Sequence, residues 1–472
     1  MTTATLPATG PAAPPAAPWR AMPILLIGAF LPILDAFIVN IALATIARDL
    51  HASPAALELT ISGYGVVYAC ALVVGGRLGD RYGRRRMLVI GMSAFTVASA
   101  ACGLAPTVAL LIVFRLLQGG AAALLFPQVL ASIQAGFAGV DRQRALGAFG
   151  AVAGGAAAVG QLLGGVLLAA DVAGLSWRPL FLINVPVGLA AVLLAPRLVH
   201  ESRSPVPARL DVRGAFGLAA TIALLLLPLT IGRSQGWPLW SWLCLAAVVP
   251  AGALFTAAQA RQERQGGSPL VPPSLLALPR ARRALVNMLA FATLVGGFNF
   301  TLAITLQVAH GFGPLRAGLV MVPCALVFLA VSLRVNRWVA VHGARILVAG
   351  ALLFAAGLAV FGAVVTGTDS ALLMSLPLIV VGIGWSMVLT PAVGFSLAGL
   401  PTDRAGLAGG VLTTALQVGL AVGASLVGSL LFGVAGPEPT AASWRAGVLG
   451  AVGFGVVLAL MTALASSRLS RR

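Results

Sequence analysis

Two ionisable side chains lie inside long apolar stretches of the sequence, where a charge is costly. Asp35 stands among Leu34, Phe37 and other apolar residues, and Arg115 lies deep in a second apolar stretch. An ionised group in the middle of a membrane needs a partner or a water-filled cavity. A buried carboxyl can take up and release a proton in the physiological range, so Asp35 is the candidate for proton exchange. The alternative is a structural acid that Asn40 or a helix hydroxyl satisfies.

Gln118 and Glu58 are two further polar candidates for this chemistry. Gln118 follows Arg115 by three positions and therefore shares its helical face. A structural alternative for Arg115 is a link to backbone carbonyls. Glu58 follows Pro54 at the expected outer start of a helix, so it is either a second proton site or a carboxylate at the substrate entrance. A solvated glutamate that favours the helix dipole is the simpler explanation.

Long apolar segments must position these residues. The chain of 472 residues is 59% hydrophobic and 9% charged, which is too apolar for one water-soluble core. A membrane-spanning helix needs roughly 20 mostly apolar residues, and such runs recur along the sequence. We predict an all-α polytopic membrane protein with fourteen spans, near 21–43, 56–76, 87–105, 107–128, 145–169, 178–199, 214–233, 239–258, 285–308, 315–333, 345–366, 370–398, 406–433 and 443–466.

The polar breaks divide the spans into two bundles. We expect a disordered cytoplasmic tail over 1–20 and an N-terminal six-helix bundle over 21–200. A connector with two extra transmembrane helices follows over 201–260, and a C-terminal six-helix bundle with a short basic tail covers 261–472. Two such bundles suggest a transporter built from repeats, with its substrate bound near mid-membrane between the halves.

The positions of the arginines fix the orientation and exclude a nucleic-acid partner. The net charge is +18 without any lysine, and 24 of the 30 arginines fall in the connectors and tails expected inside the cell. The outer connectors hold five arginines, and Arg115 lies within a span. This asymmetry follows the positive-inside rule, so both termini are expected in the cytoplasm and the charge needs no phosphate ligand. The lysine-free composition, rich in alanine and arginine, suggests a bacterial source.

The sequence lacks the motifs that are typical of metal sites, enzymes and ATP-driven pumps. The four cysteines lie in four different apolar spans without CxxC spacing, which predicts neither a disulfide framework nor a metal site. The sequence has no P-loop and no HExxH or GxSxG motif, which argues against an enzyme or an ATP-driven pump. Energy is therefore expected from a gradient, without a cofactor.

The stretch from Gly76 to Arg86, with the sequence GRLGDRYGRRR, is the most specific motif. Gly76 and Gly83 allow close helix approach and a tight turn, and Asp80 can sit at a helix N-terminus or pair with an arginine. It resembles the motif between helices two and three of the major facilitator superfamily. That resemblance implies a latch of the outward-open state, in which the further residues are Arg81, Arg84 and Arg85. A plain positive-inside loop would need only arginines.

Three further stretches resemble the fourteen-helix drug:proton antiporter branch of that superfamily. They are 34–43, which has Phe37 where threonine is usual, 115–119, and 177–186, which has Pro179 where an aromatic residue is common. The resemblance implies two six-helix bundles plus two extra helices, and an effect of Arg115 on proton coupling.

The fifth span departs from the antiporter pattern. The sequence has Gln161 where that pattern has proline, and this removes the usual cause of a kink. Gly150, Gly154, Gly160 and Gly164 keep spacings that allow close helix packing. Simple packing and a gating role are both open for these glycines, and the missing proline weakens the inference of antiport.

Polar and aromatic residues within spans of both halves define the search region for a substrate cavity, because aromatic faces suit lipophilic and cationic molecules. The candidates are Asn40, Tyr64, Tyr68, Gln118, Phe126, Phe298, Asn299, Gln307, Trp385 and Gln417. Ordinary packing or anchoring at the lipid interface is the alternative for each.

The predicted function is proton-coupled export of small lipophilic molecules, cations among them, by a monomer in the plasma membrane. A proton symporter or a lipid or metabolite transporter on the same fold is an alternative. A membrane receptor or scaffold that binds a ligand without moving it is a rival of another class, although the chain has no long soluble output domain.

Overall fold

The computed structural model describes residues 19–203, 211–232, 235–397, 405–436 and 440–469, and within these ranges the chain forms helices and no strand. The predicted tail lies outside them up to residue 18, while Trp19–Ala21 form a short 3-10 turn (η1). The helices are α1 Met22–Asp49, α2 Pro54–Tyr82, α3 Arg84–Gly103, α4 Val108–Gly136, α5 Gly139–Ala170, η2 Val172–Gly174, α6 Pro179–Leu182, α7 Asn184–Leu198, α8 Val212–Ile231, α9 Leu239–Arg264, α10 Pro273–Ala277, α11 Pro279–Ile304, η3 Thr305–Ala309, α12 Pro314–His342, α13 Arg345–Val365, α14 Ala371–Leu397, α15 Ala405–Ala435 and α16 Ala441–Leu469.

The helices are long and apolar enough for the predicted membrane protein. Thirteen helical segments of the described residues could cross a membrane by length and composition, with α6 and α7 forming one segment and α11 continuing into the π-helical turn η3. α5 has 32 residues, some with side chains outside the described set, and is a further long helix. The described chain is therefore compatible with fourteen spans.

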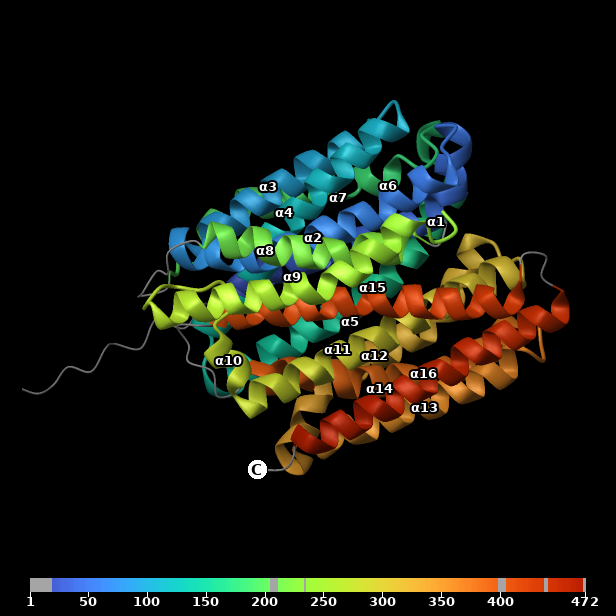
Figure 1. The fold of residues 1–472 in the computed structure, drawn as a ribbon. Coiled ribbons are helices and arrows are strands. Elements are labelled where there is room, and N and C mark those ends of the chain that lie inside the picture. Colours follow the sequence, from blue (N-terminus) through green and yellow to red (C-terminus); the bar gives the residue numbers. More distant parts are fainter. Residues whose placement is uncertain (1–18, 204–210, 233–234, 398–404, 437–439, 470–472) are drawn as a thin grey trace, which may run out of the picture.

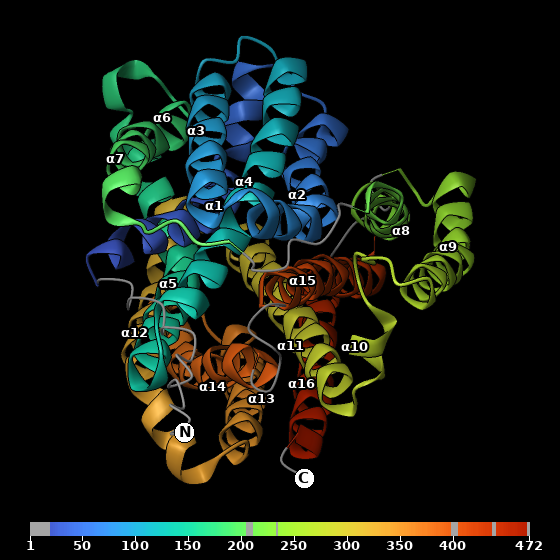
Figure 2. The same cartoon turned by 90° about the vertical axis from the view of Figure 1, so that its left-hand side faces the viewer.

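The helices form two bundles (Figure 1), and Figure 2 shows α8 and α9 as an additional pair at one side of them. Figure 2 shows α1 to α4, α6 and α7 on one side of the molecule and α11 to α14 and α16 on the other, with α5 and α15 between them. α8 packs against α2 and α15, and α9 packs on α8. The outer helix α9 exposes Leu243, Val249 and Leu254, as expected for a helix that faces lipid.

Contacts between the halves run through α5 and α15. α15 packs against α2 and α4, while α5 packs against α12 and α14. On α5, a Cβ at Gly150 would lie 3.0 Å from the Thr390 hydroxyl, and one at Gly154 would lie 1.9 Å from the Phe328 ring. Each glycine therefore lets a side chain of the other half reach the backbone of α5.

Close packing of α2 on α4 also depends on glycine, and this contact carries a prediction. A Cβ at Gly75 would lie 2.1 Å from the backbone oxygen of Ala123, whereas one at Gly65 of the same helix would meet nothing within 4 Å. We expect Gly75→Ala to lower the free energy of unfolding by about 1–3 kcal/mol, because backbone has to move. Thermal unfolding in detergent measures this, with Gly65→Ala as the matched control. Equal melting temperatures for the two variants would contradict the packing argument.

Candidate functional site

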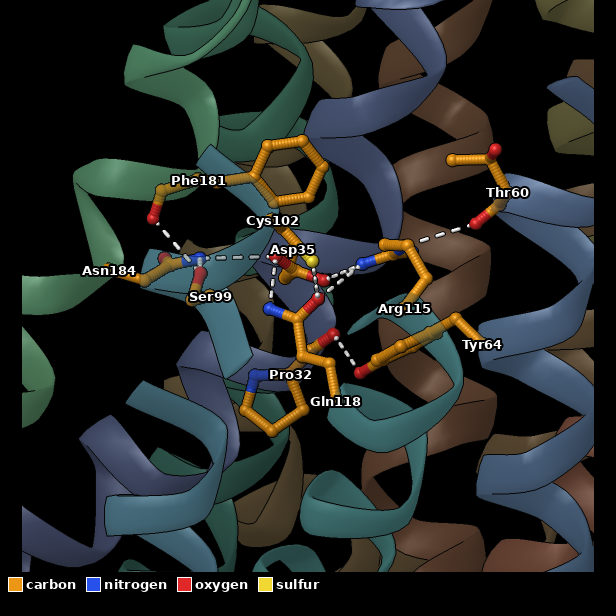
Figure 3. Close-up of polar contacts among 10 residues, drawn as sticks. All are labelled: Pro32, Asp35, Thr60, Tyr64, Ser99, Cys102, Arg115, Gln118, Phe181 and Asn184. Carbon is orange, nitrogen blue, oxygen red and sulfur yellow. Dashed lines mark hydrogen bonds and ion pairs between the residues drawn. The ribbon is translucent and has the colours of Figure 1, made fainter. Parts of the chain in front are cut away.

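The site is a fully buried polar cluster in the N-terminal bundle, centred on Asp35 of α1 (Figure 3). Its carboxylate accepts hydrogen bonds from three donors. Arg115 Nη1 forms an ion pair with Oδ2, Gln118 Nε2 donates to Oδ1 at 2.9 Å, and Asn184 Nδ2 donates to Oδ1 at 3.1 Å. The carboxylate thereby joins α1 to α4 and to the start of α7.

Arg115 of α4 links this cluster to α2. Its Nε donates to the backbone oxygen of Thr60 at 3.0 Å, and its Nη1 also donates to Gln118 Oε1 at 2.8 Å. The guanidinium lies 4.3 Å from the centre of the Tyr64 ring, a cation–π contact. Its Nη2 is buried without a protein partner. Arg115 thus holds α1, α2 and α4 together at one point, and the link to a backbone carbonyl is one of several contacts.

Sequence reasoning missed two members of the cluster. Asn184 Nδ2 also donates to Ser99 Oγ at 3.0 Å, and Ser99 Oγ donates to the backbone oxygen of Phe181 at 2.9 Å. Asn184 lies in the stretch 177–186, whose resemblance to the antiporter branch was the available signal. Ser99 carried no comparable signal in the sequence.

Aromatic rings cover the α2 side of the cluster. The Tyr64 hydroxyl donates to the backbone oxygen of Pro32 at 2.9 Å, and the Tyr64 ring stacks on Tyr68. Phe126 meets Tyr68 edge to face and also packs against Phe149. Three predicted cavity residues therefore form one buried aromatic row beside Asp35 and Arg115.

The other predicted residues of the N-terminal half lie at varied distances from this cluster. Glu58 is half-buried one turn inside α2, two residues before Thr60. The side chains of Asn40 and Gln161 lie outside the described set, although α5 runs without a break through Gln161. A Cβ at Gly160 would approach the Leu34 backbone oxygen to 2.9 Å.

The glycines of α5 face two different neighbours. Gly160 and Gly164 lie against Leu34 and Ile38 of α1, whereas Gly150 and Gly154 face the C-terminal half. α5 is therefore packed both on the helix that carries Asp35 and on α12 and α14. All four glycines therefore lie at positions where α5 packs closely against another helix.

Predicted cavity residues of the C-terminal half fall into two groups. Phe298 and Trp385 belong to a buried aromatic cluster with Phe328 and Phe354. The others are half-buried: the Asn299 amide donates to its own helix, Gln307 lies in η3, and Gln417 lies on α15.

The motif 76–86 forms the tight connection between α2 and α3. Gly76 is buried, and Gly83 has φ +111°, which favours glycine. Asp80 forms a buried ion pair with Arg84 at 2.9 Å, and Arg84 Nη1 contacts the backbone oxygen of Ala131 on α4. Arg81 is exposed and lies over the ring of its neighbour Tyr82.

Glu201, which sequence reasoning did not single out, fastens this connection to the segment after α7. Its carboxylate accepts hydrogen bonds from the backbone N–H groups of Arg85 and Arg86 at 3.1 and 3.2 Å. Arg85 also donates to the backbone oxygen of Pro196. The carboxylate therefore caps the N-terminus of α3, where negative charge is favourable.

We expect Glu201→Gln to lower the free energy of unfolding by about 0.5–1 kcal/mol, because one oxygen and the negative charge are lost at the helix N-terminus. Added salt should narrow the difference from wild type, since the dipole interaction is screened. The matched control is Glu263→Gln, whose carboxylate binds Ser274 away from the motif. Melting temperatures at low and high salt measure the effect, and a salt-independent difference would contradict a charge-based cap.

The bonds of Asp35 make this cluster sensitive to the protonation of its carboxyl. Asp35 is held by three donors from two other helices, α4 and α7, so a change in its protonation alters contacts across the bundle. Among the residues that the structure describes, no three His, Cys, Asp or Glu side chains gather as a metal site.

Known proteins are similar to this chain in sequence and in fold. The family model of the Major Facilitator Superfamily matches residues 25–424. The probable actinorhodin transporter of Streptomyces coelicolor is 37% identical over 90% of this chain and 74% of its own length. The tetracenomycin C resistance and export protein of Streptomyces glaucescens is 33% identical over 88% and 76%. The multidrug resistance protein Stp of Mycobacterium tuberculosis is 30% identical over 86% and 74%.

A solved structure of the proton:xylose symporter XylE has a TM-score of 0.63, with 17% identity and 94% of each chain covered, which shows the shared fold. The family match over most of the chain confirms the family that the motif 76–86 indicated. The chain belongs to the Major Facilitator Superfamily and is a multi-pass membrane transporter, not an enzyme, that resembles antibiotic exporters of that family.

Proposed function

We propose that this protein exports small lipophilic molecules in exchange for protons, with Asp35 as the group that exchanges the proton. The observation that carries the proposal is the buried cluster in which one carboxylate receives Arg115, Gln118 and Asn184. The names of the related actinorhodin and tetracenomycin C exporters support the direction of transport and the kind of substrate.

Protonation of Asp35 would act through Arg115. A neutral carboxyl no longer attracts the guanidinium, which keeps its bonds to Thr60 and Gln118 within α2 and α4. The interaction that joins α1 to α2 and α4 then weakens. Since Gly160 and Gly164 pack α5 on α1, movement of α1 reaches the helix that contacts α12 and α14. This couples a proton to the relative position of the bundles 21–200 and 261–472.

Transport in vesicles tests the proposal. The purified full-length protein is reconstituted in liposomes, a pH gradient is imposed, and the flux of tetracenomycin C or actinorhodin is measured. We expect substrate to move against the direction of proton flow and a protonophore to stop the accumulation. Movement of substrate with the protons would identify a symporter instead, and saturable binding without flux would identify a receptor. The proposal needs no cofactor beyond the gradient and no second subunit.

A further inference from the structure

An aromatic cluster of the C-terminal half surrounds the indole of Trp385 on α14. Phe298 of α11 meets this ring at 6.1 Å and 87°, and Phe328 of α12 meets it at 5.7 Å and 76°. Phe354 of α13 lies at 6.4 Å. The three phenyl rings pack directly on the indole and form with it a rigid apolar surface, on which a flat aromatic ligand can stack once that surface is uncovered.

This cluster lies at the boundary between the two halves. The Phe328 ring touches the backbone of α5 at Gly154. Ser332, one turn after Phe328 on α12, bonds to Ser386, which directly follows Trp385, and to Thr390, which lies against Gly150 of α5. Because α5 closes on α12 and α14 at these points, separation of the halves would uncover the aromatic cluster.

The cluster contains a hydrogen-bond donor that the protein does not use. Trp385 is 7% exposed, and its Nε1 is buried without a partner. An indole N–H can only donate, and a buried donor that stays unpaired is costly. A ligand that presents a carbonyl or ether oxygen would satisfy it.

The helices of the C-terminal half offer no carboxylate that would pair with a cationic ligand. The helices α11 to α16 contain no aspartate or glutamate, and the described ion pair of Asp35 with Arg115 is neutral as a unit. A cation that enters the interior loses its water, and aromatic faces return only part of that loss. An uncharged ligand avoids the penalty.

We propose that Trp385 donates its indole N–H to an oxygen acceptor of an uncharged, flat aromatic substrate, and that the protein binds such molecules in preference to permanent cations of the same shape. The inference rests on the proposed function, because it names the class of substrate for that exporter. It narrows the substrates predicted from the sequence, which included cations.

Two probes with one ring skeleton test the charge preference. Acridone is uncharged and carries a carbonyl oxygen, whereas N-methylacridinium is a permanent cation. Binding of each to the full-length protein in nanodiscs is followed by probe fluorescence. We expect acridone to bind at least about tenfold more tightly, a difference of about 1.4 kcal/mol.

The variant Trp385→Phe removes the donor but keeps an aromatic ring. We expect it to weaken acridone binding about tenfold and to leave N-methylacridinium unchanged. The matched control is Trp242→Phe, because Trp242 is exposed on α9 and should not affect either probe. An unchanged melting temperature shows that Trp385→Phe is folded.

Three results would overturn the inference: equal or tighter binding of the cation, acridone binding that is insensitive to Trp385→Phe, or no saturable acridone binding at all. The proposed function fails separately. If acridone binds as expected but no proton gradient drives flux of any substrate, the inference about the binding site is kept and the proposed export function is rejected. If proton-driven flux occurs but favours the cation, the proposed export function is kept and the inferred preference for uncharged substrates is rejected.

Discussion

Replacement of Asp35 by asparagine is expected to reduce substrate accumulation driven by a pH gradient to the level of protein-free vesicles. Asparagine can still accept hydrogen bonds from Gln118 and Asn184 through its amide oxygen, so the local packing is kept. It cannot gain or lose a proton, and it removes the charge that holds Arg115. Exchange of labelled for unlabelled substrate without a gradient should continue at a rate near that of wild type, since that exchange needs no proton.

Asp49 of the same helix supplies the matched control. Hydrogen bonds from Trp177 and Arg178 lower the pKa of the Asp49 carboxyl below its ordinary value, so it stays ionised at working pH and exchanges no proton. Asp49→Asn should therefore preserve gradient-driven accumulation. Undiminished accumulation in Asp35→Asn would reject Asp35 as the coupling group, and equal losses in the two variants would point to a structural defect.

The sequence was sufficient for the helices and for the central pair of the site. Apolar length predicts the spans because a membrane helix has to satisfy its backbone internally and fill the bilayer thickness. The cost of an isolated charge singled out Asp35 and Arg115, and the spacing of Gln118 put it on the face of Arg115. The structure brings these three side chains together.

The partners from distant helices could not be predicted in the same way. Asn184 and Ser99 are uncharged, and polar uncharged residues are common in membrane helices, so only the three-dimensional packing of α7 on α1 and α3 identifies them. Glu201 illustrates the same limit. A glutamate beside arginines after a span resembles any solvated connector residue until its carboxylate is found on the backbone of α3.

The direction in which the glycines of α5 face was also open. Their spacing predicts a packed surface, but the four residues are spread over several turns of a helix between two neighbours. The structure divides them, with Gly160 and Gly164 on α1 and Gly150 and Gly154 on the C-terminal half. Helix contacts of this kind depend on which helices are adjacent, which periodicity within one helix does not specify.

Replacement of Arg115 by methionine is expected to lower the free energy of unfolding by about 3–5 kcal/mol, the usual penalty for removing one partner of a buried ion pair. Methionine retains an apolar stem beside the Tyr64 ring, but the carboxylate of Asp35 loses its cation, and the Thr60 and Gln118 oxygens lose a donor. Unfolding in detergent, followed by tryptophan fluorescence, measures the loss. Arg48→Met is the control, since Arg48 is exposed at the end of α1, and it should change stability by less than about 0.5 kcal/mol.

The double variant Asp35→Asn with Arg115→Met separates charge from packing. If the penalty arises from the uncompensated carboxylate, removal of both charges should recover most of the stability lost in Arg115→Met. The recovery should be incomplete, because the backbone oxygen of Thr60 and Gln118 Oε1 still lack the donor that Arg115 provides. A double variant as unstable as Arg115→Met would show that packing around the guanidinium, and not the ion pair, holds the three helices together. Since the proposed coupling needs Asp35 to control Arg115 through charge, that result would also remove the route by which a proton moves the bundles.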